Sequence, residues 1–154
     1  MSTHTLSTER LAPIHDLAEK READAARMLA DAQRLLADRE AQLRELENYK
    51  EPVPTQGAPA LQSAALMRNR ELFRLRLAEA IRFQRQAVAD ARARVESARN
   101  VWLMQRRQTK VYEKLIQRGE AAEQREQERR EQRDYDELAL RQARDLPSGQ
   151  TLDS

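Results

Sequence analysis

The fold is decided by residues 61–144, which read LQSAALMRNRELFRLRLAEAIRFQRQAVADARARVESARNVWLMQRRQTKVYEKLIQRGEAAEQREQERREQRDYDELALRQAR. This stretch contains no proline and one glycine, Gly119, and most of its other residues tolerate or favour helix. An unbroken helix of this length extends roughly 125 Å. Helices of globular proteins rarely exceed about 25 residues, so the stretch predicts a coiled coil or a related rod. A membrane span is excluded because an arginine, lysine or carboxylate recurs every few positions.

The composition favours long helices that pack along a thin interface. The chain has 154 residues, of which 40% are hydrophobic, 4% aromatic and 35% charged, and its mean hydropathy is -0.91. These values are too polar for a thick core, so we expect one domain. The absence of cysteine excludes disulfides and thiolate metal sites. The opening MSTHTLSTER lacks the basic end and apolar core of a signal peptide, so we expect a cytoplasmic protein.

The net charge of +2 conceals a segregation along the chain. Residues 68–118 hold 14 Arg or Lys against 5 Asp or Glu, whereas residues 1–50 and 119–145 are net acidic. A basic middle of this kind can meet nucleic acid, an anionic membrane or an acidic protein surface. A solvated helix face explains it equally well.

The first helix is expected over residues 14–50, after a flexible N-terminal segment, residues 1–13. Helical periodicity begins at Ile14, and Pro13 suits the first turn of a helix. Apolar residues then recur every seven positions, at Leu29, Leu36 and Leu43.

Residues 51–60 read EPVPTQGAPA, and their three prolines and one glycine predict a turn. A short connection between two long helices folds them into an antiparallel hairpin. If Lys50 faces Ala60, the numbers of paired residues sum to about 110, which places Leu29 near Ile81.

The second helix, expected over residues 61–145, carries a heptad line at Ile81, Val88, Val95 and Trp102. We expect the interface to end near Trp102, where the first helix has no further residues to pair. Residues beyond the apolar cluster at 112–116 are mostly Glu, Arg and Gln, as in an exposed helix. Residues 147–154 should form a disordered tail.

The predicted fold is therefore all-α. We expect an antiparallel two-helix coiled-coil hairpin over residues 14–146, with a long protruding C-terminal helical arm.

Residues that carry chemistry are scarce. His4 and His15 are the only histidines, and the sequence contains no HExxH motif, phosphate-binding loop or nucleophile elbow. Carboxylates are numerous, but two paired helices offer no deep cavity in which to activate them. We therefore predict no enzymatic activity, no cofactor and no metal site.

Several stretches occur together in an order that resembles a known family. They are Asp16-Leu17-Ala18-Glu19-Lys20, Asp24-Ala25-Ala26-Arg27, Gln42-Leu43, Leu46 and Tyr49 in the first helix, and Phe73, Leu77, Ala80-Ile81, Arg85 and Trp102 in the second. With this order, spacing and single turn, the chain resembles the FliJ family of the bacterial flagellum. That family is the stalk-like component of the type III export apparatus, and the resemblance covers residues 14–143.

The resemblance implies a coiled coil similar to the rotor stalk of F-type ATPases. Its chain ends would enter the pore of the hexameric export ATPase. Other implied partners are the cytoplasmic domain of the membrane export gate and the export chaperones, with no nucleic acid. The implied role is to couple the ATPase to the gate in flagellum biogenesis, motility and chemotaxis. The implied location is cytoplasmic, with peripheral association through the gate at the inner face of the cell membrane.

The resemblance also implies a gate-binding surface, which maps onto Gln42, Leu46, Tyr49, Phe73, Leu77, Ala80 and Gln84. Two positions depart from the family pattern. The family often has histidine where Gln84 stands, and a tyrosine expected just after Tyr49 is replaced near Pro52-Val53. The spacing of these residues alone favours a second apolar line in the hairpin core, and it is the resemblance that favours a partner surface instead.

Three other functions fit a helical rod. The first is the matching stalk of a virulence-type secretion system. The second is a nucleic-acid-binding coiled coil that uses residues 68–118, although the arginines there spread around the helix and the aromatic residues form no stacking platform. The third is a passive structural spacer.

Overall fold

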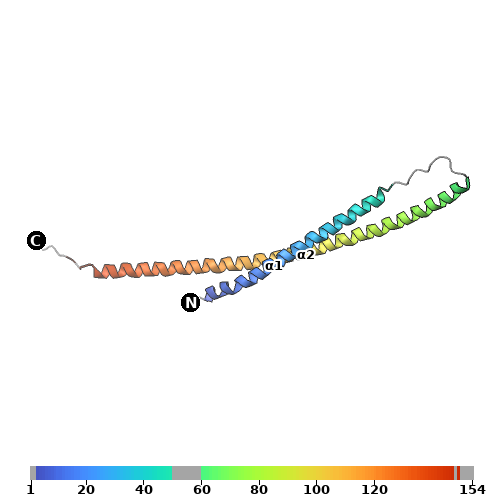
Figure 1. Cartoon of the computed structure of the whole chain (residues 1–154). Helices are drawn as coiled ribbons and strands as arrows, with labels where there is room; N and C mark the ends of the chain where they lie inside the picture. The colour runs from blue at the N-terminus through green and yellow to red at the C-terminus, as the bar shows by residue number, and fades with distance from the viewer. Residues whose placement is uncertain (1–2, 50–59, 148, 150–154) are drawn as a thin grey trace. The chain divides into compact units, whose positions relative to one another are not determined.

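The computed structural model describes residues 3–49, 60–147 and 149, and within them the protein is all-helical. Its two long helices are α1, Thr3–Glu47, and α2, Ala60–Asp145 (Figure 1). The predicted turn at residues 51–60 lies outside the described residues except for Ala60, which begins α2. Most of the expected tail also lies outside them. No segment of the described helices is apolar enough over a sufficient length to cross a membrane.

Helix α1 begins at Thr3, which corrects the expected start at Ile14. Pro13 lies inside the helix, where a proline removes one backbone hydrogen bond. The residues before Pro13 nevertheless have a packing partner, because Thr8 lies against Gly119 of α2. We attribute the helix before Pro13 to this packing, which a search for apolar periodicity does not detect.

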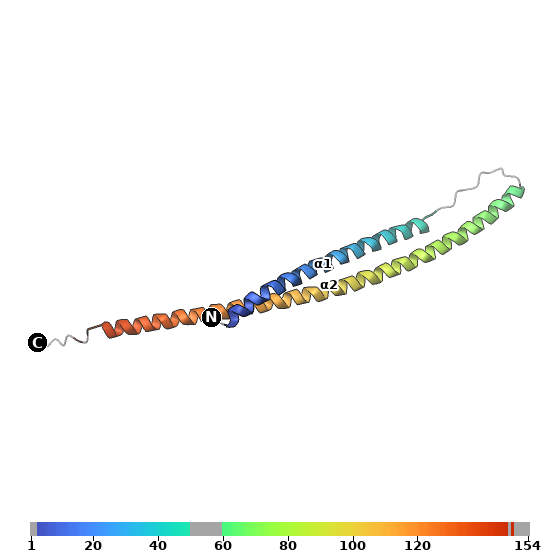
Figure 2. The same ribbon diagram turned by 60° about the horizontal axis from the view of Figure 1, so that its bottom comes forward.

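The chain divides into two compact units. The central unit is residues 20–106, and the terminal unit combines residues 1–19 with residues 107–154. In the central unit α1 and α2 lie side by side in both views (Figures 1 and 2). Glu40 lies opposite Arg92, at 3.4 Å, and Glu47 lies opposite Arg85, at 3.2 Å. Later residues of α1 thus meet earlier residues of α2, and the helices are antiparallel.

The register of the central unit differs from the expected one. The side chain of Gln84 contacts Arg39, a pair whose numbers add up to 123, and Glu40 and Arg92 add up to 132. The expected sum near 110 is therefore wrong, as is the pairing of Leu29 with Ile81. The expected sum assumed that the two helices contact each other directly after the turn. Instead most side chains of residues 64–76 are exposed, although the ring of Phe73 contacts Tyr49 just past the end of α1.

The core of the central unit is thin and made largely of small side chains. Ala25, Val88 and Ala91 are buried, at 5%, 4% and 3% exposure. The remaining members of the two predicted heptad lines, such as Leu36 and Val95, are half-buried. Alanine at the closest contacts permits a short distance between helix axes, and the larger residues close the sides. The heptad pattern therefore identified the interface-facing side chains correctly.

In the terminal unit α1 packs against α2 through residues beyond Trp102, which corrects the expected end of the interface. Ala18 and Thr109 are buried, at 5% and 4% exposure. Their partner segments exist because α1 begins at Thr3 and the register is shifted. From residue 127 to residue 147 every described side chain is exposed. The predicted pair Glu137–Arg141 is present there, at 2.8 Å.

Candidate partner-binding surface

The α1 part of the candidate surface lies at the end of that helix, in the central unit. Gln42 and Leu46 are four residues apart and lie on one side of α1, and Tyr49 follows just past the helix end at Glu47. Gln42 is exposed, Leu46 is half-buried, and Tyr49 is 52% exposed. The backbone N–H of Tyr49 donates to the carbonyl oxygen of Leu46 at 3.4 Å, so the aromatic ring is carried on the last turn.

The α2 part consists of Phe73, Leu77, Ala80 and Gln84, at spacings of four and three. Phe73 is 39% exposed, and the other three residues are half-buried. Each side chain is therefore divided between the interface with α1 and the solvent.

The structure brings two pairs of these residues together across the helices. The rings of Tyr49 and Phe73 have centroids 5.3 Å apart and planes tilted by 45°, a favourable aromatic arrangement. The Nε2 of Gln84 donates to the backbone carbonyl oxygen of Arg39 at 2.9 Å and to Oε1 of Gln42 at 3.2 Å. A glutamine thus occupies this position with both a backbone and a side-chain partner.

The geometry distinguishes the aromatic pair from a core. A core aromatic residue is mostly shielded from water, whereas Tyr49 and Phe73 both keep a large exposed fraction. The pair presents apolar area next to half-buried Leu46 and Leu77. Exposed apolar area on a strongly charged protein is typical of a contact surface.

The comparison with known protein families identifies the family of this chain. A family model described as the flagellar FliJ protein matches residues 7–146, nearly the whole chain. The chain belongs to the FliJ family. No curated protein and no solved structure matches it. The resemblance stated from the sequence is confirmed.

The FliJ family is a structural, non-enzymatic component of flagellar type III protein export. Such a component works through its surfaces. The seven residues of the implied gate-binding surface, which fall within residues 42–49 and 73–84, all lie in the central unit.

Sequence reasoning missed the charged residues around this FliJ-family surface. Arg85 pairs with Glu47, and Arg92 pairs with Glu40, although both arginines remain about two-thirds exposed. Exposed ion pairs of this kind contribute at most about 1 kcal/mol each. The sequence contains their signal as opposite charges on the flanks of both heptad lines, but an incorrect register hides the pairing.

Other large apolar side chains near the start of α2 are exposed as well. Four more large apolar side chains near Phe73 on α2 are exposed, namely Leu66, Met67, Leu72 and Leu75. They follow the start of α2, in the part of the helix that precedes its pairing with α1.

Proposed function

We propose that this protein is a stalk of the flagellar type III export apparatus that couples the export ATPase ring to the membrane export gate and assists export chaperones. The observation that supports this proposal is the family match over residues 7–146 of a chain that forms two long paired helices. In this proposal the protein is cytoplasmic and associates with the inner face of the membrane through the gate.

The proposed stalk is an antiparallel coiled-coil hairpin whose α2 continues as a C-terminal arm. The exposure of every described side chain from residue 127 to residue 147 supports the arm, because that part of α2 has no partner surface within the described chain. The chain ends are proposed to enter the ATPase ring. Exposed Tyr135, Leu138 and Leu140 supply apolar area for that contact.

The proposed gate-binding surface consists of Gln42, Leu46, Tyr49, Phe73, Leu77, Ala80 and Gln84. Its support is the exposed Tyr49–Phe73 pair and the closeness of Gln42 to Gln84. Large apolar side chains that become buried on binding carry most of the energy of an interface. Phe73 is accordingly the proposed anchor.

The double variant Phe73→Ala with Leu77→Ala tests this assignment. Alanine is a strong helix former and both positions are at least partly exposed, so we expect a melting temperature close to that of the wild type. Loss of two apolar anchors should weaken binding to the purified gate domain by about 2 kcal/mol or more, roughly thirtyfold. Binding to the export ATPase should be retained. Isothermal titration with each partner and a thermal melt supply the measurements.

The matched control is Leu138→Ala with Leu140→Ala, which removes similar apolar volume from exposed positions of the same helix. This control should bind the gate domain as the wild type does. A folded Phe73 and Leu77 variant that binds the gate normally would remove the site assignment. A variant that loses its helical signal would instead place both residues in the core. If neither the wild type nor any variant binds gate or ATPase, the protein is a passive spacer.

A further inference from the structure

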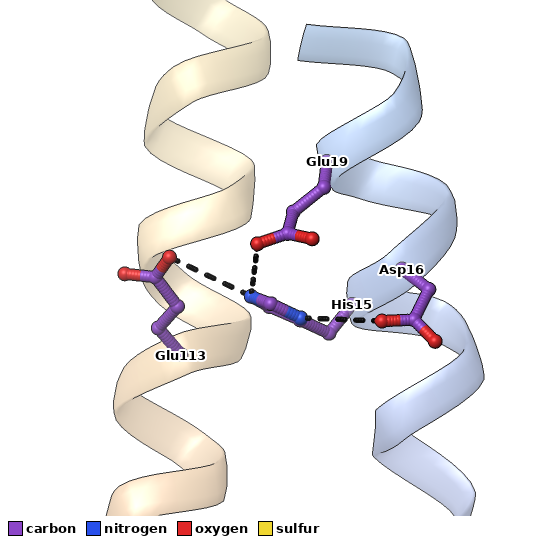
Figure 3. A network of polar contacts seen from close by, with 4 residues as sticks. All are labelled: His15, Asp16, Glu19 and Glu113. Carbon is purple, nitrogen blue, oxygen red and sulfur yellow. Dashed lines mark ion pairs between the residues drawn. The ribbon is translucent and has the colours of Figure 1, made fainter. Parts of the chain in front are cut away.

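One polar cluster in the terminal unit has the composition of a metal site. His15 and Glu19 lie one helical turn apart on α1, and Glu113 reaches the same point from α2 (Figure 3). The Nε2 of His15 lies 3.6 Å from Oε1 of Glu19 and 3.5 Å from Oε1 of Glu113. One nitrogen and two carboxylate oxygens thus converge, and these three atoms lie within 4.8 Å of one another.

The separations are too long for hydrogen bonds and correct for two ligands of one ion. Hydrogen bonds from N–H to oxygen span about 2.7–3.2 Å. Zinc lies about 2.1 Å from nitrogen and oxygen ligands, and tetrahedral geometry therefore separates neighbouring ligand atoms by about 3.4 Å. The two measured distances, 3.5 and 3.6 Å, match the second value and exceed the first.

The imidazole nitrogen at the centre of the cluster lacks another partner. The Nε2 atom of His15 is inaccessible to solvent and makes no hydrogen bond within the described part of the chain. The side chain as a whole is 18% exposed. A buried polar atom without a hydrogen-bond partner raises the free energy of the folded state, and a ligand bound at this position would remove that cost.

The opposite edge of the ring supplies an independent observation. The Oδ1 of Asp16 lies 3.8 Å from Nδ1 of His15, on the side of the imidazole that faces away from both glutamates (Figure 3). Histidines that ligate metals usually direct their second nitrogen at a carboxylate or carbonyl, which orients the ring. Asp16 lies on the side of the ring where such an orienting group would bind, at a separation longer than a hydrogen bond.

Electrostatics favour a cation at this point. Three carboxylates, those of Asp16, Glu19 and Glu113, surround a single imidazole. A divalent cation at this point would neutralise most of the negative charge that the two glutamates bring to it. The alternative source of positive charge is the imidazole itself, which would form a metal-free ion-paired clasp when protonated.

We propose that His15 Nε2, Glu19 Oε1 and Glu113 Oε1 bind one first-row divalent cation, with water at its remaining coordination position. The donor set selects Zn²⁺ over Mg²⁺ and Ca²⁺, because the latter two prefer all-oxygen sites. The ion links α1 to α2 in the terminal unit. Because only the folded chain presents all three ligands, binding stabilises the folded state. The site is independent of the export role, since it uses this chain alone.

Titration of the purified full-length chain with ZnCl₂ tests the site. We expect binding of one equivalent in competition with a chromophoric chelator, and a melting temperature that rises with Zn²⁺ concentration. Co²⁺ as a spectroscopic substitute should give the intense visible absorption of a tetrahedral site. MgCl₂ at the same concentration should leave the melting temperature unchanged.

Matched variants locate the ion. His15→Ala and Glu113→Gln should abolish one-equivalent binding, whereas His4→Ala and Glu128→Gln, which make the same chemical changes elsewhere, should retain it. Asp16→Asn should weaken affinity on the order of tenfold while keeping the stoichiometry. The proposal is overturned if Zn²⁺ does not bind, or if Glu113→Gln and Glu128→Gln bind it equally.

Discussion

Gly119, the one glycine within α2, occupies a close approach between the helices of the terminal unit. A Cβ added at this position would lie 2.6 Å from Oγ1 of Thr8 on α1. Real Cβ atoms do not come so close to another heavy atom, so either Thr8 must move or the position must be glycine. Glycine inside a helix costs about 1 kcal/mol relative to alanine. The free-energy cost of glycine in this helix therefore accompanies the close contact between Thr8 and Gly119.

This contact predicts an unusual response to Gly119→Ala. In the wild-type chain we expect the substitution to lower the melting temperature, because displacing the Thr8 side chain costs more free energy than the higher helix propensity of alanine gains. In a Thr8→Ala background the obstruction is removed, and Gly119→Ala should then stabilise the protein by up to about 1 kcal/mol. Thermal melts of the four proteins of this cycle provide the measurement. Equal effects in both backgrounds would show that the two residues do not interact.

At the scale of one helix, α2 has an interface face and a solvent face with opposite tolerance to charge. Val88 is buried at 4% exposure, whereas Val111, on the same helix, is 54% exposed. The two residues have identical intrinsic helix propensity, so they form a matched pair for substitution.

Val88→Asp is therefore predicted to destabilise the central unit strongly. It places an unpaired carboxylate in a thin core, at a cost of roughly 3 kcal/mol, which is a large share of the stability of a small protein. Val111→Asp should cost less than about 1 kcal/mol, and half-buried Leu36→Asp should fall between the two. Circular dichroism with urea unfolding measures all three. Similar midpoints for Val88→Asp and Val111→Asp would contradict the assigned interface face.

Across the whole molecule, the density of helix–helix contact predicts a gradient of backbone protection. Residues 25–43 and 81–98 include the buried and half-buried side chains of the central unit, whereas residues 127–145 are exposed throughout. Segments with few buried contacts open at low free energy.

Native-state hydrogen exchange should accordingly show slower exchange at residues 25–43 and 81–98 than at residues 127–145. Mass spectrometry measures the exchange rate of individual peptides. Uniform slow exchange along α2 would mean that a second copy of the chain covers residues 127–145. Addition of the export ATPase should slow exchange at these residues if the proposed role of the arm is correct.

The helical class, the two long helices and the interface-facing heptad lines could all be predicted from the amino-acid sequence. Helix propensity and apolar spacing are local properties, so the proline-free stretch and the lines through Leu36 and Val88 could be identified without coordinates. The family followed from the order of short motifs, and the seven proposed gate-binding residues followed from the family. Their spacing alone does not separate a surface from a core.

The tertiary structure alone decided the register, the start of α1 and the pairings across the helices. A heptad repeat leaves the register open, because sliding one helix by seven residues preserves the apolar pattern. The contacts that distinguish one register from another here involve polar or small residues such as Gln84, Thr109 and Gly119, which no hydrophobic repeat marks. The convergence of His15, Glu19 and Glu113 depends on the register for the same reason. Residues nearly a hundred positions apart in the sequence become neighbours only when the register between the two helices is set.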